Sequence, residues 1–149
     1  MKHLVVCVIC VFFVISVATS AAADNPAGVI KTIKGAASIV HQDKVTSAAY
    51  GQKIFKGDTI KTGPDGSLGI IFEDDTLISL GPNSEIVINE YVFAPAQGNL
   101  SIVTRMIKGT VTYLSGIIAK LSPNSVKFET PTATLGIRGT KFYAQVEEN

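Results

Sequence analysis

The chain has 149 residues, of which 13 are lysine or arginine and 12 are aspartate or glutamate, giving a formal net charge of +1. This balance, without any cluster of basic residues, provides no electrostatic basis for nucleic-acid binding. Both cysteines, Cys7 and Cys10, lie close to the N-terminus. The rest of the chain therefore cannot form a disulfide, a thiolate metal site or a thiol nucleophile.

The first 23 residues have the pattern of a secretory signal peptide. A basic start precedes an apolar run over residues 4–17, which is shorter than the roughly 20 residues that a membrane-spanning helix needs. The spacing Ala21-x-Ala23 then predicts cleavage before Asp24. We therefore expect an exported protein, periplasmic or extracellular, with an uncleaved membrane anchor as the alternative.

Residues 24–149 are long enough for a hydrophobic core, and we expect them to form a single domain. No second apolar run approaches spanning length, so no membrane span is expected in the mature chain. Turn residues recur at short intervals, and the runs between them are rich in isoleucine, valine, threonine, phenylalanine and tyrosine. This pattern is typical of many short β-strands.

The first strands can be placed in chain order. Residues 28–30 and 35–39 are expected to form an opening strand pair. Residues 67–80 read as one hairpin with Asp74 and Asp75 at its tip, because aspartate tolerates the positive φ of a tight turn better than most residues. The strands of this hairpin are apolar on both faces, and we expect them to be covered above and below.

Three later segments also favour strands. In residues 100–109 the β-branched side chains favour strand over helix. Residues 126–129 and 141–146 alternate between apolar and polar side chains, which predicts strands with one buried face. The predicted fold class is therefore all-β, either an irregular β-solenoid or a rolled or sandwich sheet of many short strands.

Residues suited to catalysis or metal binding are few. His41 is the only histidine after the first 23 residues; it lies in a polar stretch between two strands and is expected to be a solvated loop residue. Glu73, Asp74 and Asp75 lack the alternating oxygen donors of a calcium loop and are expected to be solvated at the hairpin tip. No phosphate loop or dinucleotide fingerprint is present. We expect no catalytic residue, no metal and no cofactor, and hence no enzyme.

A set of short motifs nevertheless occurs in a defined order. Its members are Gly57, Asp58, Thr62, Gly63, Asp74, Gly109, Pro131, Arg138, Gly139, Thr140 and Phe142. From Gly28 to about Val146 the chain resembles the FecR-type periplasmic domain, the sensor portion of ferric-citrate-type sigma regulators and of many stand-alone secreted proteins. The sequence departs from the family at Asp75, where the family hairpin usually has glycine.

The resemblance implies an all-β domain that acts by protein–protein contact without catalysis, with motif residues that are structural. The sigma regulators also carry a cytoplasmic segment before a membrane helix and further periplasmic sequence after the β domain. Neither is expected here, so the chain resembles the β module alone, exported free.

Arg138 has two interpretations. In the structural one, Gly139 lets the last strand bend while Arg138 pairs with a carboxylate elsewhere, for which Asp58 is the first candidate. In the functional one, Arg138 is exposed and contacts a partner, and a planar guanidinium suits either role. The structural interpretation is the prediction, which makes residues 130–142 the closing latch of the domain.

The predicted function is that of a signalling-associated interaction module with an unknown protein partner in the cell envelope. The alternative is a structural or surface protein associated with the cell wall or with polysaccharide. No sequence feature separates the two.

Overall fold

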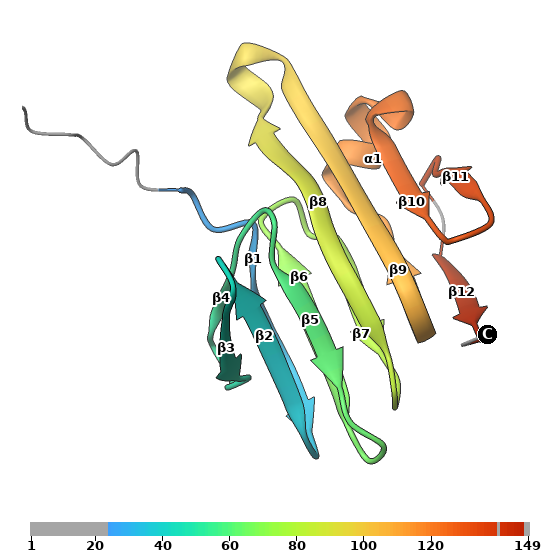
Figure 1. The fold of residues 1–149 in the computed structure, drawn as a ribbon. Helices are drawn as coiled ribbons and strands as arrows, with labels where there is room; N and C mark the ends of the chain where they lie inside the picture. The colour runs from blue at the N-terminus through green and yellow to red at the C-terminus, as the bar shows by residue number, and fades with distance from the viewer. Residues whose placement is uncertain (1–23, 140, 148–149) are drawn as a thin grey trace, which may run out of the picture.

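The computed structural model describes residues 24–139 and 141–147, and most of its regular structure is strand (Figure 1). The strands are β1 (Gly28–Lys34), β2 (Ala37–His41), β3 (Lys44–Ser47), β4 (Lys53–Ile54), β5 (Thr59–Thr62), β6 (Ser67–Phe72), β7 (Leu77–Leu80), β8 (Glu85–Ala94), β9 (Asn99–Leu114), β10 (Val126–Glu129), β11 (Thr134–Gly136) and β12 (Lys141–Val146). A short helix, α1 (Ile117–Leu121), and two 3-10 turns, Pro95–Gln97 and Pro123–Ser125, complete these described elements. The all-β prediction is confirmed, whereas the predicted signal peptide lies outside the described residues.

The strands form one 12-stranded sheet whose main path runs in the order β3-β2-β5-β8-β9-β7-β6-β1-β4, with every neighbouring pair antiparallel. The sheet curls into a half-barrel, which corresponds to the rolled sheet among the predicted alternatives. In Figure 1 strands β2, β5 and β8 form a front wall, and strands β1, β6 and β7 form a back wall behind it. The first and last strands of the path, β3 and β4, are the two ends of the curl.

The core lies between these two walls. Alternate residues of each strand point inwards, so the front wall contributes Ile39, Ile60, Ile86 and Ile88 and the back wall contributes Ile30, Leu68, Ile70, Phe72, Ile78 and Leu80. All ten are at most 2% exposed. Burying one such aliphatic or aromatic side chain contributes about 1.5–3 kcal/mol, so this core is a main source of the stability of the fold.

The outer face of the back wall corrects one prediction. Strand β7 was expected to be covered on both faces, but Leu77 and Ser79 are exposed while Ile78 and Leu80 are buried. Strand β6 comes closer to the expectation, because Ile71 on its outer face is half-buried. A central place in the sheet therefore does not bring a second covering layer here, since the half-barrel has a core on its inner face alone.

The opening strand pair is also corrected. Both predicted strands exist, but β1 pairs with β4 and β6 in the back wall, whereas β2 pairs with β3 and β5 in the front wall. The chain crosses between the walls at Gly35, whose φ of 66° is the left-handed region that glycine adopts without strain. This crossing lets the apolar faces of β1 and β2 meet the same core from opposite sides.

Strand β9 connects the parts of the sheet. It is 16 residues long, which confirms strand over helix for residues 100–109. Its first half pairs with β8 on one side and in parallel with β10 on the other. Its second half pairs with β7 and β12. The pairing of β9 changes from β8 and β10 to β7 and β12 near Gly109, where φ is 93°.

Candidate functional site

The Asp74 carboxylate lies at the hairpin tip, but it is fully buried and not solvated as predicted. Its oxygens accept hydrogen bonds from the Thr76 hydroxyl at 2.8 Å, the Ile118 N–H at 3.2 Å, and the Thr76 N–H and Tyr91 hydroxyl at 3.3 Å. Helix α1 covers this network. The next residue, Asp75, is exposed and has a φ of 65°, as the turn interpretation requires. The prediction of a solvated tip therefore holds for Asp75 and is wrong for Asp74.

Two tyrosines lie close to the Asp74 carboxylate. Burial, and then the negative charge of Asp74, raises the pKa of Tyr91 well above its ordinary value. The same two causes, in the same order, raise the pKa of Tyr113. Both phenols therefore stay protonated in the folded state, where the Tyr91 hydroxyl donates to Asp74 and accepts its backbone N–H. The arrangement holds the hairpin, β8 and α1 together and leaves no opening for a substrate in the network.

Three motif residues lie where the sheet turns from one pair of strands to the next. Thr62, 8% exposed, accepts a hydrogen bond from the Ser84 N–H at 2.9 Å and donates one to the Gly81 carbonyl at 2.7 Å. The Gly63 carbonyl accepts the N–H of Asn83. A Cβ on Gly109 would lie 2.4 Å from the Ser84 Cα. These three motif residues thus fix the end of β5 and the bend of β9 around one turn.

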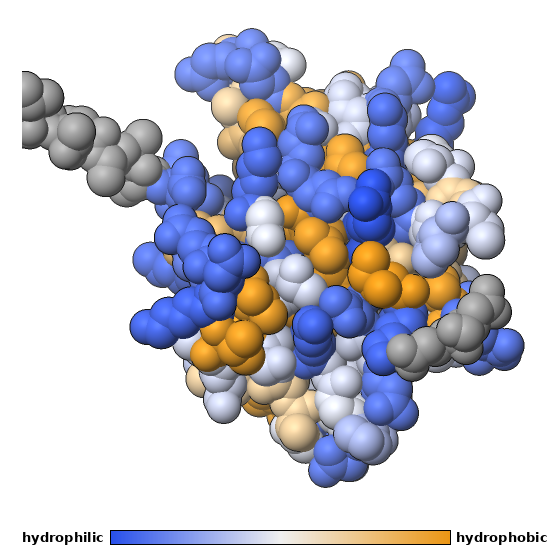
Figure 2. Space-filling view, viewed as in Figure 1, coloured by the Kyte–Doolittle hydropathy of each residue, from blue (hydrophilic) through white to orange (hydrophobic). Residues whose placement is uncertain are grey.

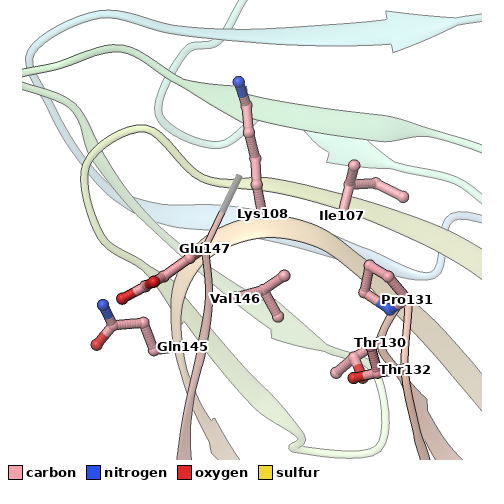
Figure 3. A pocket seen from close by; sticks show the side chains of 8 residues that line it. All are labelled: Ile107, Lys108, Thr130, Pro131, Thr132, Gln145, Val146 and Glu147. Carbon is pink, nitrogen blue, oxygen red and sulfur yellow. The ribbon is translucent and has the colours of Figure 1, made fainter. Parts of the chain in front are cut away.

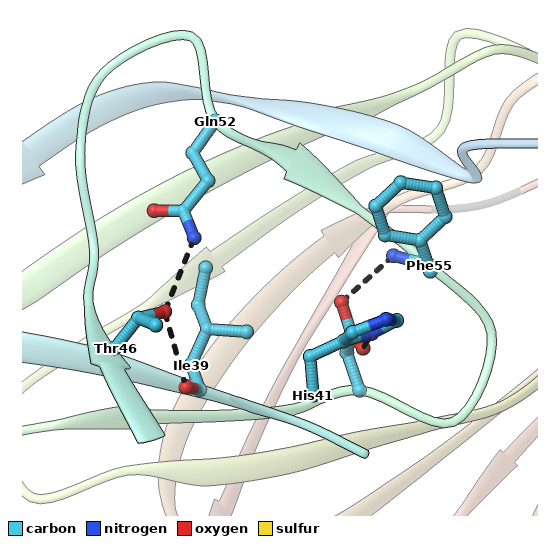
Figure 4. A network of polar contacts seen from close by, with 6 residues as sticks. Ile39, His41, Thr46, Gln52 and Phe55 are labelled. Atoms are coloured by element: carbon cyan, nitrogen blue, oxygen red, sulfur yellow. Dashed lines mark hydrogen bonds and ion pairs between the residues drawn. The ribbon is translucent and has the colours of Figure 1, made fainter. Parts of the chain in front are cut away.

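Asp58 is buried as well, but its surroundings differ. It is 1% exposed; its Oδ1 bonds the Nδ1 of His41 at 2.5 Å, and its Oδ2 accepts the Phe55 N–H at 2.8 Å (Figure 4). His41 ends strand β2 and is 39% exposed, so it is not the solvated loop residue that was predicted. Gly57, with a φ of 86°, makes the turn before Asp58 and donates its N–H to the Ile88 carbonyl.

The predicted pair between Arg138 and Asp58 is wrong. Arg138 is exposed, and both Asp58 oxygens are used by His41 and Phe55. Gly139 has a φ of 64°, consistent with a bend there, while Thr140 lies outside the described residues. The sequence predicted that an ion pair of Arg138 holds this last segment against the domain. In the structure, apolar side chains hold it.

Phe142 anchors the last strand. Its ring stacks on Tyr113 with centroids 5.1 Å apart and meets Phe128 edge-on at 5.2 Å. Strand β12 pairs with β9 from Lys141 to Val146, with Phe142, Ala144 and Val146 facing inwards as predicted. Aromatic pairs of this kind contribute about 0.5–1.5 kcal/mol beyond their buried area. The alternation of residues 141–146 was the signal that identified this strand.

A groove runs along β9 where its outer partners end. Pairing with β10 stops at Arg105 and pairing with β12 stops at Gly109. Between these points lies a hollow of about 450 Å³, continuous with two neighbouring hollows through shared wall residues (Figure 3). We call this the β9 groove; its wall is formed by Ile107, Lys108, Thr130, Pro131, Thr132, Gln145, Val146 and Glu147.

The β9 groove combines apolar and hydrogen-bonding surface. Ile107 is 37% exposed, and Pro131, the motif residue of this wall, is exposed beside it. In Figure 2, which has the view of Figure 1, apolar surface is visible over β9 and extends towards β12 among polar side chains. One end is fixed by Arg105, which bonds Glu129 through Nε at 3.1 Å and Nη2 at 3.0 Å. An open groove of this kind suits an extended segment of another polypeptide.

Within residues 24–139 and 141–147, no group of three or more histidine, cysteine, aspartate or glutamate side chains could hold a metal ion. The same part of the chain contains no helix long and apolar enough to cross a membrane.

Comparison with known proteins gives one match. The sequence model of the family described as FecR protein matches residues 58–149, more than half of the chain. No curated protein and no solved structure matches this chain. The matched residues include the Asp74 network, the bend at Gly109 and the whole β9 groove, whereas His41 and Phe55 precede them.

Proposed function

Because this chain belongs to the FecR protein family, which is associated with signalling and regulation, we propose that it is an exported, non-catalytic module that binds another protein of the cell envelope. The signal-peptide pattern of residues 1–23 supports export. The ordinary role of such a module is to change the activity or location of its partner by contact.

The observation that carries this proposal is the β9 groove. It lies inside the matched residues, and its wall joins segments that are far apart in the sequence: the middle of β9, the turn after β10 and the end of β12. Exposed Ile107 and Pro131 supply apolar contact, and Thr130, Thr132 and Gln145 supply donors and acceptors around it. Apolar anchors surrounded by polar groups are typical of protein-binding surfaces.

The sealed Asp74 carboxylate supports a non-catalytic role. Asp74 is sealed under α1 and satisfied by protein donors, so a substrate cannot reach it without local unfolding. The β9 groove itself is lined by one lysine and one glutamate and by no serine, cysteine or histidine. The wall therefore lacks the Ser–His or Cys–His pair that is common in covalent hydrolases.

A pair of charge substitutions tests the proposal. Ile107→Asp places a charge in the β9 groove, and Ser79→Asp places the same charge on the exposed face of β7, outside the groove wall. We expect Ile107→Asp to weaken association with the envelope partner by at least about tenfold, as for an interface anchor, and Ser79→Asp to leave it unchanged. The measurement is quantitative co-purification after in vivo cross-linking through an ultraviolet-activated residue at position 132. Adducts with polysaccharide alone, or equal association for both variants, would refute the proposal.

Export is tested separately. The protein recovered from the envelope fractions is expected to begin at Asp24, as determined by its intact mass. A mass that includes residues 1–23 would indicate an anchored protein.

A further inference from the structure

A second hollow lies at the opposite end of the molecule, where the two ends of the sheet come together. Its volume is about 360 Å³, and we call it the seam pocket. Strand β2 supplies Ile39 and His41, β3 supplies Lys44 and Thr46, and the β4 region supplies Lys53 and Phe55. The register pairs Ile39 with Thr46 and His41 with Lys44, so all four lie on the same inner face of the β2–β3 hairpin.

The seam pocket is open because the sheet does not close. Strands β3 and β4 end the strand path and are not neighbours in it. They are bridged by the side chain of Gln52, which donates to the Thr46 hydroxyl at 3.4 Å (Figure 4). Thr46 in turn donates to the Ile39 carbonyl. Figure 2 shows apolar surface over β2, β3 and β4, the strands that surround the seam.

The histidine in this pocket is held in a fixed orientation. Its Nδ1 bonds Asp58, and its ring lies against Phe55 with centroids 5.2 Å apart and planes inclined by 49°. An ionised carboxylate can only accept, so Nδ1 carries a hydrogen and Nε2 is the ring nitrogen left for a ligand. A carboxylate bonded to one ring nitrogen fixes the orientation and tautomer of a histidine, as it does for histidines that bind metals.

The charges of the wall favour an anion. Lys44, Lys53 and His41 can carry positive charge, and the one acidic side chain of the wall, Asp58, already bonds His41 and the Phe55 N–H. Ile39 and Phe55 provide apolar surface beside these groups. A pocket of this size with an apolar wall and few polar groups is typical of sites for small organic molecules.

We propose that the seam pocket binds a small organic carboxylate with a flat apolar body. The carboxylate lies between Lys44 and Lys53 and accepts a hydrogen bond from the Nε2–H of His41 in its doubly protonated form, and the apolar body lies against Phe55 and Ile39. The site is separate from the β9 groove, and apart from Asp58 its wall residues precede residues 58–149, which match the family model. It therefore adds a ligand site at the end of the molecule opposite the surface assigned to a protein partner.

The test uses the whole protein as purified from cells, and small molecules of known structure as ligands. Binding of 3-phenylpropanoate is measured by calorimetry and by shifts of the amide signals of residues 39–55, beside the isosteric 3-phenylpropanamide and plain acetate. We expect 3-phenylpropanoate to bind at least about tenfold more tightly than either, since a charge-assisted bond and apolar burial each contribute. A short peptide that ends in phenylalanine with a free carboxylate tests the alternative ligand, which is the C-terminus of a polypeptide in place of a small molecule.

Matched variants locate the site. Lys53→Gln and Lys44→Gln, both exposed, are expected to weaken binding by about fivefold each without changing the fold, whereas Lys31→Gln on β1 is expected to leave it unchanged. Equal affinity for 3-phenylpropanoate and its amide would overturn the proposal. So would absence of binding at millimolar concentration, equal binding by all three variants, or binding of the peptide alone. Ile107→Asp, which tests the β9 groove, is expected to leave the seam pocket intact, so the two proposals fail independently.

Discussion

The two buried aspartates, Asp58 and Asp74, have almost the same exposure but different surroundings. Asp74 is bonded by Thr76, Tyr91 and the Ile118 N–H, and helix α1 separates it from solvent. Asp58 is bonded by one backbone N–H and by a histidine that is 39% exposed and lines an open pocket. Burial of a carboxylate therefore does not define its role. A carboxylate whose hydrogen-bond donors are buried, such as Asp74, is a fixed part of the fold. A carboxylate with a donor at the surface, such as Asp58, is connected to a ligand site.

Removing the Asp74 carboxylate is expected to have the largest effect. Asp74→Ala leaves the Thr76 hydroxyl and the Ile118 N–H buried without their acceptor, which costs about 3–5 kcal/mol in the free energy of unfolding. Denaturant unfolding measures it. The matched control is Asp75→Gly at the exposed neighbour with positive φ, expected to be neutral or slightly stabilising. A loss below about 1 kcal/mol for Asp74→Ala would show that the network is not sealed.

Raising the pH is expected to destabilise the fold through the two tyrosines beside Asp74. Folding raises the pKa of Tyr91 and Tyr113 above the ordinary value near 10, so the stability they contribute is complete below that pH and is lost as the pH rises beyond it. For fully buried Tyr113 the free energy of unfolding falls by up to about 1.4 kcal/mol per pH unit. Urea titrations from about pH 8 to about pH 11 measure this slope. Tyr113→Phe is expected to reduce this slope to the part that Tyr91 contributes, and Tyr143→Phe at an exposed position is the control. An unchanged slope for Tyr113→Phe would contradict the assignment.

Removing the Asp58 carboxylate is expected to cost less. Asp58→Ala frees His41 and the Phe55 N–H, but His41 is exposed enough for water to replace its partner, so we expect about 1–2 kcal/mol. The sharper consequence is local. In NMR spectra the amide and ring signals of Phe55 and His41 should change, while the amide signal of Ile118 should not. An equal loss of stability for the two aspartate variants would remove the contrast between them.

Arg138→Ala is expected to have the smallest effect, below about 0.5 kcal/mol, because the side chain is exposed. Phe142→Ala is the comparison, since it removes the stack on Tyr113 and the edge contact with Phe128. Melting curves of both variants test where the last strand is anchored. A large loss for Arg138→Ala would restore the charge-based latch that the structure excludes.

The sequence predicted what depends on local pattern. Alternation identified β10 and β12, β-branched residues identified β9 as strand, and Asp75 at positive φ was anticipated from the turn. These features depend on neighbours within a few residues, where side-chain period and turn chemistry act directly.

The partners of the charged residues were not predictable in the same way. Asp74 is sealed by Ile118, 44 positions later, and Asp58 is bonded by His41, 17 positions earlier. Nothing in the local sequence of "FEDDT" distinguishes the buried aspartate from the exposed one beside it. The walls of the β9 groove are likewise set by the register of β9 with β10 and β12, which a single sequence does not specify.

Amide hydrogen exchange of two residues compares the aspartates most directly. The Ile118 N–H is donated to Asp74 Oδ2 at 3.2 Å, and the Phe55 N–H is donated to Asp58 Oδ2 at 2.8 Å. Bond length alone would give Phe55 the slower exchange. We predict the opposite: Ile118 exchanges only when the whole domain unfolds, and Phe55 exchanges faster, through local opening of the seam pocket. Exchange at Phe55 as slow as at Ile118 would contradict the distinction between a sealed carboxylate and one that supports a ligand site.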